Sequence, residues 1–265
     1  MTPQPFHRPG FLRHGLAPLL VALLLVPAAS LSAQSSDGYL FDSPAGSIGI
    51  RGGFAFATAG GDVFELLTTE HTLKRGDFHS PAMSADLAIT LSDRLDLAAS
   101  VGYANVKRNS ELDGWEGEDG LPIAQTTEYR RMPVTAGLKY YLRDRGRQIG
   151  RLAWVPERYL PYVGVGAGWT RYSLQQSGEF VDFQSCEVID GEQYCDIVAG
   201  FLGSEGWTPT AYVAGGLDVA IMPKVVLNAD ARYAFASAHP GPDYSGYEAI
   251  DLAGLQTTVG VSLRF

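Results

Sequence analysis

The C-terminal stretch Leu252–Phe265 constrains the fold more than any other part of the chain. Its odd-numbered positions from Leu255 onward are mostly apolar, whereas its even-numbered positions are polar or small. A period of two places successive side chains on opposite faces of a β-strand. In a membrane barrel the apolar face lies in lipid, the polar face lines the lumen, and an aromatic residue such as Phe265 joins a girdle at the interface. The stretch therefore predicts a transmembrane strand.

Seven earlier segments repeat this alternation, at about residues 46–57, 80–91, 95–104, 127–142, 160–175, 207–221 and 225–235. The eight strands are separated by long breaks that alternate with shorter ones. An even number of strands places both chain termini on the periplasmic side and the long loops outside. An open sheet would leave backbone groups unpaired in lipid, whereas a closed sheet pairs them. We therefore predict an all-β fold, an eight-stranded antiparallel up-and-down transmembrane β-barrel with long external loops, formed by residues 45–265.

Residues 1–33 have the pattern of a secretory signal peptide. Arg8 and Arg13 precede the apolar run 16–27, and small residues before Ala33 suit cleavage after that position. Beyond this region no run reaches the roughly 18 apolar residues that a transmembrane helix needs. Residues 34–44 are predicted to be a periplasmic lead-in. Together with the strand pattern, this signal predicts the outer membrane of a Gram-negative type of envelope.

The composition argues against nucleic acid as a partner. The formal net charge is −9, and loss of Arg8 and Arg13 with the signal peptide makes the mature protein more acidic. Phosphate backbones attract basic surfaces, so an acidic protein is a poor candidate for binding them. A charged fraction of only 18 % with 31 glycines is also unlike a soluble enzyme. We expect no cofactor.

Two cysteines, Cys186 and Cys195, lie in the exported part of the chain. An even number of cysteines in an oxidising compartment predicts a disulfide. Between them, Asp190-Gly191 is a hairpin-turn dipeptide, and no histidine lies in this loop. The pattern favours a disulfide over a metal site or a reactive thiol, on a hairpin formed by residues 176–206 that rises above the membrane.

Three further long breaks, at residues 58–79, 107–126 and 237–250, are predicted external loops, the first with a possible helical turn at Phe64–Leu67 and the second without regular structure. They are polar and acidic. A solvated acidic crown is the simplest interpretation, and the functional alternatives are cation bridging to lipopolysaccharide phosphates or recognition of a basic partner. No loop has the spacing of a dedicated calcium site, so we predict no metal ligands.

The connection at residues 143–159 is basic and falls on the periplasmic side, where turns are usually short. We predict a segment that lies against inner-leaflet lipid, with its arginines on phosphates and Trp154 in the aromatic belt. A partner-binding turn is the alternative.

The chain resembles the small eight-stranded outer-membrane barrels of the OmpA-barrel, OmpX and OmpW kind over essentially all of residues 45–265. The resemblance is sharpest at the C-terminus. Such proteins end on an aromatic residue with apolar residues at alternate positions before it, which the barrel assembly machinery reads. The resemblance implies this role for Val259, Val261, Leu263 and Phe265. It also implies outer-membrane lipid and lipopolysaccharide as partners, and we expect a monomer.

An eight-stranded barrel has an interior that side chains can fill. Charged residues on the polar faces of the predicted strands would meet there and would need to pair. The predicted lumen charge network is Arg51, Asp86, Asp96, Arg131, Lys139, Asp218, Asp230, Arg232 and Arg264. Aromatic residues near strand ends are predicted at the membrane interface: Tyr103, Tyr140, Trp154, Trp169, Tyr233 and Phe235.

These features predict a structural or surface-interaction role with an ion-paired, plugged lumen. The alternatives are a narrow, porin-like pore or an OmpW-like channel for small hydrophobic molecules. A lipid A-modifying enzyme is the less favoured third hypothesis, because nucleophilic catalysis needs base, nucleophile and orienting group in contact. The candidates for it, which form no spaced His-x-Ser pair at a strand end, are His71, His79, His239, Ser80, Ser237 and Asp77. We predict no catalytic residues.

Overall fold

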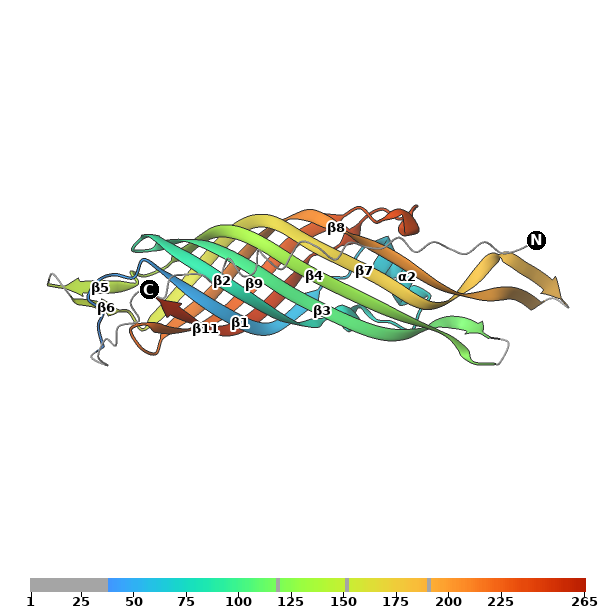
Figure 1. Ribbon diagram of the computed structural model, residues 1–265, viewed down its shortest axis with the longest axis horizontal. Coiled ribbons are helices and arrows are strands. Elements are labelled where there is room, and N and C mark those ends of the chain that lie inside the picture. Colours follow the sequence, from blue (N-terminus) through green and yellow to red (C-terminus); the bar gives the residue numbers. More distant parts are fainter. Residues whose placement is uncertain (1–37, 118–119, 151–152, 190–191) are drawn as a thin grey trace, which may run out of the picture. The chain divides into compact units, whose positions relative to one another are not determined.

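The alternating segments pair into a closed β-barrel (Figure 1). The structure is a computed structural model that describes residues 38–117, 120–150, 153–189 and 192–265, so the predicted signal peptide lies outside the described residues. The strands of the ring are β1 (Gly46–Ala57), β2 (Ser80–Ser92), β3 (Leu95–Glu116), β4 (Pro122–Tyr141), β7 (Tyr159–Ile189), β8 (Glu192–Ala220), β9 (Val225–Ala238) and β11 (Gly254–Arg264). All neighbours are antiparallel, and β11 pairs with both β9 and β1 to close a ring of eight strands. The predicted fold class is confirmed.

The closing pair joins the first and last strands along their whole length. Ile48 lies opposite Leu263, and Ala57 lies opposite Gly254. Past the end of β11, the Phe265 N–H donates to the Gly46 carbonyl at 3.1 Å, and the Phe265 carbonyl accepts from the Ala45 N–H at 2.8 Å. Closure removes the free edges within the wall, which lipid could not satisfy.

The more apolar face of the wall points outward. Ile50, Met83 and Val259 are 71 %, 62 % and 67 % exposed. Arg51, one residue along from Ile50, points inward and its side chain is 11 % exposed. An apolar exterior around a polar interior is the arrangement of a transmembrane barrel.

Shorter elements fill the connections. The first outer connection holds a helix, α2 (Asp62–Thr69), as predicted, and a 3-10 turn, η1 (Arg75–Phe78); the last holds η2 (Pro242–Tyr244) and β10 (Ile250–Asp251). At the inner end, β5 (Gly146–Ile149) and β6 (Ala153–Pro156) form a separate two-stranded hairpin. No helix within the described residues has both the length and the hydropathy needed to cross a membrane.

Two of the predicted external loops are long β-hairpins. Beyond the wall, β3 and β4 stay paired, with Lys107 opposite Glu128 and Glu111 opposite Ala124, so the expectation of an irregular loop at residues 107–126 is wrong. Backbone pairing does not depend on side-chain polarity, so strands continue where the apolar alternation stops. The β7–β8 hairpin extends similarly and carries the predicted disulfide between Cys186 and Cys195, which is confirmed. Its Asp190-Gly191 turn lies outside the described residues.

Candidate functional site

The middle of the lumen is built around Arg51 on β1. Its guanidinium donates two hydrogen bonds to Asp86 on β2, one of them from Nε at 2.7 Å, and its Nη1 lies 3.4 Å from Asp230 on β9. The hydroxyl of Tyr162 donates to Asp230 at 2.7 Å. Arg232 is 3.9 Å from the same carboxylate. Four of the predicted lumen charges therefore meet, and charge-assisted hydrogen bonds offset part of the cost of removing them from water.

Glycines on the inner face make room for the tyrosine rings of this network. A Cβ at Gly216 would lie 2.5 Å from the Tyr162 hydroxyl oxygen, and one at Gly137 would lie 2.6 Å from that of Tyr212. These separations are far below van der Waals contact, so a larger residue at either glycine would displace the ring. The Arg232 guanidinium carbon lies 4.3 Å from the centroid of the Tyr212 ring, a cation–π distance.

Asp218 on β8 organises a second group nearer the inner end. It accepts hydrogen bonds from Lys139 Nζ at 2.6 Å, from the Tyr141 hydroxyl at 2.9 Å and from Asn228 Nδ2 at 2.7 Å. The Lys139 ammonium also lies 3.8 Å from the centroid of the Tyr162 ring. Three donors, one of them the Lys139 cation, satisfy this carboxylate although its side chain is only 5 % exposed.

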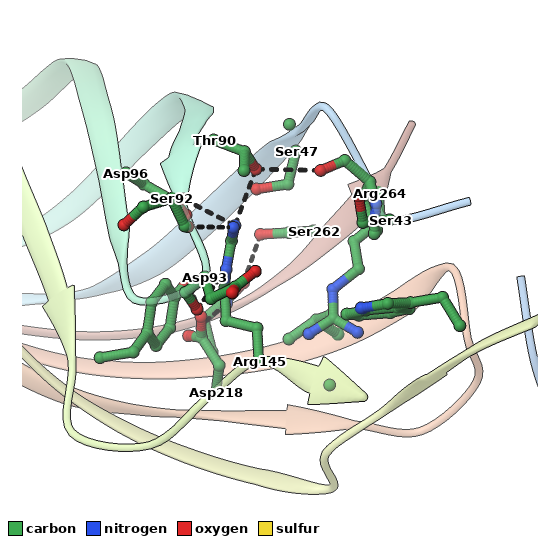
Figure 2. Close-up of a pocket in the computed structure, with 17 residues that line it drawn as sticks. Ser43, Ser47, Thr90, Ser92, Asp93, Asp96, Arg145, Asp218, Ser262 and Arg264 are labelled. Atoms are coloured by element: carbon green, nitrogen blue, oxygen red, sulfur yellow. Dashed lines mark hydrogen bonds and ion pairs between the residues drawn. The ribbon is translucent and has the colours of Figure 1, made fainter. Parts of the chain in front are cut away.

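Arg145 lies at the inner mouth, and the predicted network did not include it. Its Nη1 donates to Asp96 and to the Thr90 hydroxyl, each at 2.7 Å, and its Nη2 donates to the Ser92 carbonyl at 2.5 Å (Figure 2). The predicted contact of this arginine with lipid phosphate is therefore wrong. Arg145 lies four residues after the last residue of β4, and the buried carboxylate of Asp96 is close enough to hold it inside.

Trp154 is likewise not in the lipid-facing aromatic belt at the inner leaflet, where it was predicted. It is 7 % exposed, and its backbone N–H and carbonyl pair with Leu40 at 2.7 and 2.8 Å. The Arg264 guanidinium carbon lies 5.6 Å from the centroid of its ring. The Trp154 ring of the β5–β6 hairpin therefore lies close to the Arg264 cation. The Trp154 backbone pairs with Leu40 of the predicted lead-in. Arg143, Arg147 and Arg158 of the same connection are exposed.

Two small cavities separate these groups. One, of about 110 Å³, lies at the inner mouth between Arg145, Asp218 and Arg264 (Figure 2). The other, of about 60 Å³, lies in the middle of the lumen beside Arg51 and Lys139. A water molecule takes about 30 Å³ in the liquid, so each cavity has room for a few waters at most.

A hydrophobic cluster fills the outer mouth. Val63, Phe64 and Leu67 of α2 are each 0 % exposed, and the Phe64 ring centroid lies 4.8 Å from that of Phe78 and 5.4 Å from that of Tyr129 on β4. Residues of the last outer connection complete the cluster: Tyr244, Ile250 and Leu252. We refer to these residues as the outer cap. The sequence feature that could have predicted the outer cap is the group of apolar residues within an otherwise polar loop.

Arg131 lies beside the outer cap and stays apart from the other predicted lumen charges. It is 9 % exposed, its guanidinium carbon lies 5.0 Å from the centroid of the Tyr129 ring, and its Nη1 donates to the Leu252 carbonyl at 3.5 Å. Among the described residues neither Arg131 nor Arg264 has a carboxylate partner. The Arg131 guanidinium lies over the Tyr129 ring, and the Arg264 guanidinium lies over the Trp154 ring.

The three loop histidines have different surroundings. His71 is 8 % exposed, and burial lowers the pKa of its imidazole. The imidazole of His79 packs edge-on against Phe56, with ring centroids 5.3 Å apart, and the backbone carbonyl of His239 accepts from Tyr172. Across the described ranges, no His, Cys, Asp or Glu residues form a group of three that could hold a metal ion.

The remaining predicted membrane-interface residues and the assembly-signal residues lie on the outward face of the barrel wall. Tyr103, Tyr140, Trp169 and Phe235 are 38 %, 44 %, 61 % and 52 % exposed, and Tyr233 stacks edge-on against Phe235 at 4.8 Å. The proposed assembly-signal residues also point outward, with exposures of 41 % to 67 %: Val259, Val261, Leu263 and Phe265.

No protein-family model matches this sequence, and no curated protein matches it. Solved structures do resemble it. Neisserial surface protein A is 12 % identical over 83 % of this chain and 97 % of its own, with a TM-score of 0.43. Ail, the attachment invasion locus protein of Yersinia pestis, is 14 % identical over 83 % and 99 %, with a TM-score of 0.40. The N-terminal β-barrel domain of Pseudomonas aeruginosa OprF is 12 % identical over 84 % and 100 %, with a TM-score of 0.34. All three are small outer-membrane β-barrels. The fold of this chain rests on its own ring of strands and outward apolar face.

Proposed function

We propose that the protein is a monomeric barrel of the bacterial outer membrane, closed to solutes, with a structural or surface-interaction role and no catalytic activity. The observation that carries this proposal is the outer cap, which fills the outer mouth with packed apolar side chains. The paired lumen charges and the Arg145 contacts at the inner mouth support it. Outer-membrane lipid, lipopolysaccharide and the barrel assembly machinery are the partners that such a protein meets.

The energy of the outer cap favours the closed state. Burying a Val, Leu or Phe side chain stabilises a protein by about 1.5–3 kcal/mol, so withdrawing Val63, Phe64 and Leu67 into water costs roughly 5 kcal/mol or more. At about 1.4 kcal/mol for each factor of ten, fewer than about one molecule in a thousand would have an open outer mouth. Such rare opening suits a plug better than a channel.

The surface role is supported by the two long hairpins. The β3–β4 and β7–β8 hairpins continue beyond the wall, and the rings of Trp115 and Phe183 connect them with centroids 5.6 Å apart. The disulfide holds the end of the second hairpin. These paired, acidic and exposed hairpins suit contact with a basic partner better than transport.

Recordings in planar bilayers test closure directly. Purified wild-type protein should give no reproducible conductance steps, whereas Phe64→Asp with Leu67→Asp should open the outer mouth. Glu65→Gln on the exposed face of α2 is the matched control and should stay silent. Stable steps from the wild type would overturn the proposal and favour the narrow pore.

An opened variant that adds no charge, Phe64→Asn with Leu67→Asn, should prefer anions. The predicted lumen charge network and Arg145 together hold six cations, Arg51, Arg131, Lys139, Arg145, Arg232 and Arg264, against four carboxylates, Asp86, Asp96, Asp218 and Asp230. Asp93 at the inner mouth adds a fifth carboxylate, which leaves the positive charge in excess. Excess positive charge along a narrow path attracts anions and repels cations. Reversal potentials in a salt gradient measure this preference, and cation selectivity would contradict the arrangement.

Mass spectrometry of lipid A tests the non-catalytic part of the proposal. Cells with and without the protein should have identical lipid A acylation. An acylation difference that His79→Ala abolishes would overturn it.

A further inference from the structure

Three basic residues face outward at the outer end of neighbouring strands. Lys107 on β3 is exposed, and the side chains of Arg130 on β4 and Arg171 on β7 are 42 % and 38 % exposed. Strand alternation puts them on the same face as Tyr103 and Trp169, which point away from the lumen. We refer to Lys107, Arg130 and Arg171 as the basic rim.

The strand register makes the basic rim one continuous patch. Arg130 lies opposite Asn105, two residues from Lys107, and Arg171 lies opposite Met132, two residues from Arg130. Diagonal neighbours of this kind are within reach of long side chains. Met132 and Trp207 are the cross-strand neighbours of Arg171 and lie beside the patch. Farther down the wall lie other outward apolar and aromatic residues: Val101, Tyr103, Val134 and Trp169.

The patch covers only one side of the barrel. At the same end, the outward residues of β9, β11 and β1 are uncharged: Tyr233, Phe235, Leu255, Thr257, Phe54 and Phe56. Above the rim, the hairpins are acidic, with Glu111, Glu179 and Asp182 among their residues. A ligand with negative charge is therefore attracted to the rim and repelled from the region above it.

We propose that the basic rim binds the phosphate-bearing headgroup of a lipid in the outer leaflet, whose acyl chains lie on the aromatic residues below. Guanidinium groups form paired hydrogen bonds with phosphate oxygens, and Trp and Tyr rings mark the headgroup level of a membrane. The inference rests on the membrane location in the proposed function. Glu128 and Glu205 lie 2.5 Å from Arg130 and 3.9 Å from Arg171, and Glu128 is also the cross-strand neighbour of Lys107. Such partly exposed ion pairs are weak, so the three basic side chains can exchange them for phosphate.

The test uses the folded protein in phosphatidylcholine nanodiscs, titrated with bisphosphorylated lipid A, with tryptophan fluorescence as the readout because Trp169 and Trp207 flank the rim. The variant K107Q/R130Q/R171Q should bind roughly 10- to 100-fold more weakly, since each basic residue near a charged membrane surface contributes about fivefold. The control R143Q/R147Q/R158Q removes the same charge from exposed positions at the inner end. It should bind like the wild type.

A second variant tests the sign of the effect without removing a basic side chain. E128Q/E205Q should bind lipid A more tightly than the wild type, because both arginines lose their competing carboxylates. Equal affinity of the rim variant and the wild type, or an equal loss in the inner-end control, would overturn the inference. Displacement of lipid A by millimolar inorganic phosphate would show a site for soluble anions instead, which also overturns it. Lipid A binding is measured independently of conductance. A barrel that conducts no current and whose lipid A affinity does not depend on the basic rim would therefore reject the lipid site but not the proposed function.

Discussion

Individual side chains in the lumen depend on partners from other strands. Asp218→Ala would leave Lys139 buried without its carboxylate, and breaking a buried ion pair costs about 3–5 kcal/mol. We expect a loss of this size in the free energy of unfolding, measured by urea titration in lipid vesicles. Replacing both partners, in Lys139→Met with Asp218→Leu, should cost much less because no charge is left unpaired. Equal losses in the two variants would contradict the pairing.

His71 should give the first outer connection a pH dependence. Its Nδ1 is buried and has no hydrogen-bond partner among the residues that the structure describes, and burial lowers the pKa of the imidazole from its ordinary value of 6.5. The folded state then binds a proton less readily than the unfolded state. Stability is therefore complete above about pH 6.5 and is lost as the pH falls through the lowered pKa.

Hydrogen exchange can detect this change locally, because the Thr72 N–H donates to Glu111 and the Asp113 N–H donates to Glu70. Protection of these two amides should fall as the pH drops below about 6.5. In His71→Gln, their protection should be independent of pH over the same range. A decrease of equal size in both proteins would assign the effect to another group.

At the scale of the elements, we expect the outer end of the β7–β8 hairpin to be stabilised independently of the barrel wall. The disulfide joins Cys186 to Cys195 outside the wall, so it restricts the end of the hairpin and not the ring. C186S/C195S should speed proteolytic cleavage near residues 183–194 several-fold while leaving the thermal midpoint of the barrel unchanged. Limited proteolysis and heat-dependent gel mobility measure the two effects. A lowered midpoint would mean that the hairpin supports the wall.

The elements also differ in how far the sequence predicts them. Within the wall, lipid on one side and polar groups on the other impose a period of two, so strands such as β1 and β11 can be located and oriented. Beyond the membrane that constraint ends, which is why the paired ends of β3 and β4 were missed. The strand faces predict that Arg51 and Asp86 point inward, and their contact depends on the register.

Contacts of irregular segments are harder to predict. The connection after β4 contains several arginines in similar local sequence, and only the folded position shows that Arg145 meets Asp96. Trp154 was assigned to lipid because tryptophans favour interfaces, but its partners Leu40 and Arg264 are each more than a hundred residues away in the chain. Tertiary contacts of this kind leave no local pattern.

For the whole molecule, formation of the barrel should depend on Phe265. Its backbone continues the β1–β11 pairing through Gly46, and its exposed ring completes the proposed assembly signal. Removing Phe265 should sharply reduce the amount of folded, heat-modifiable barrel in cells. Removing Gly246, which sits in the last outer connection with open space around it, is the matched single-residue control. Normal yield without Phe265 would argue against the proposed signal.

The position of Arg51 has a consequence for the order of folding. Its two carboxylate partners lie on β2 and on β9, so the ion pair with Asp230 spans the junction between the first and last strands. In a sheet that has not yet closed, this arginine and Asp230 would meet lipid or water separately. Lipid penalises unpaired charge as well as unpaired backbone. A partly formed ring is therefore disfavoured by its unpaired charges and by its unpaired backbone groups. The last strand joins the first in the same cooperative step that pairs the lumen charges.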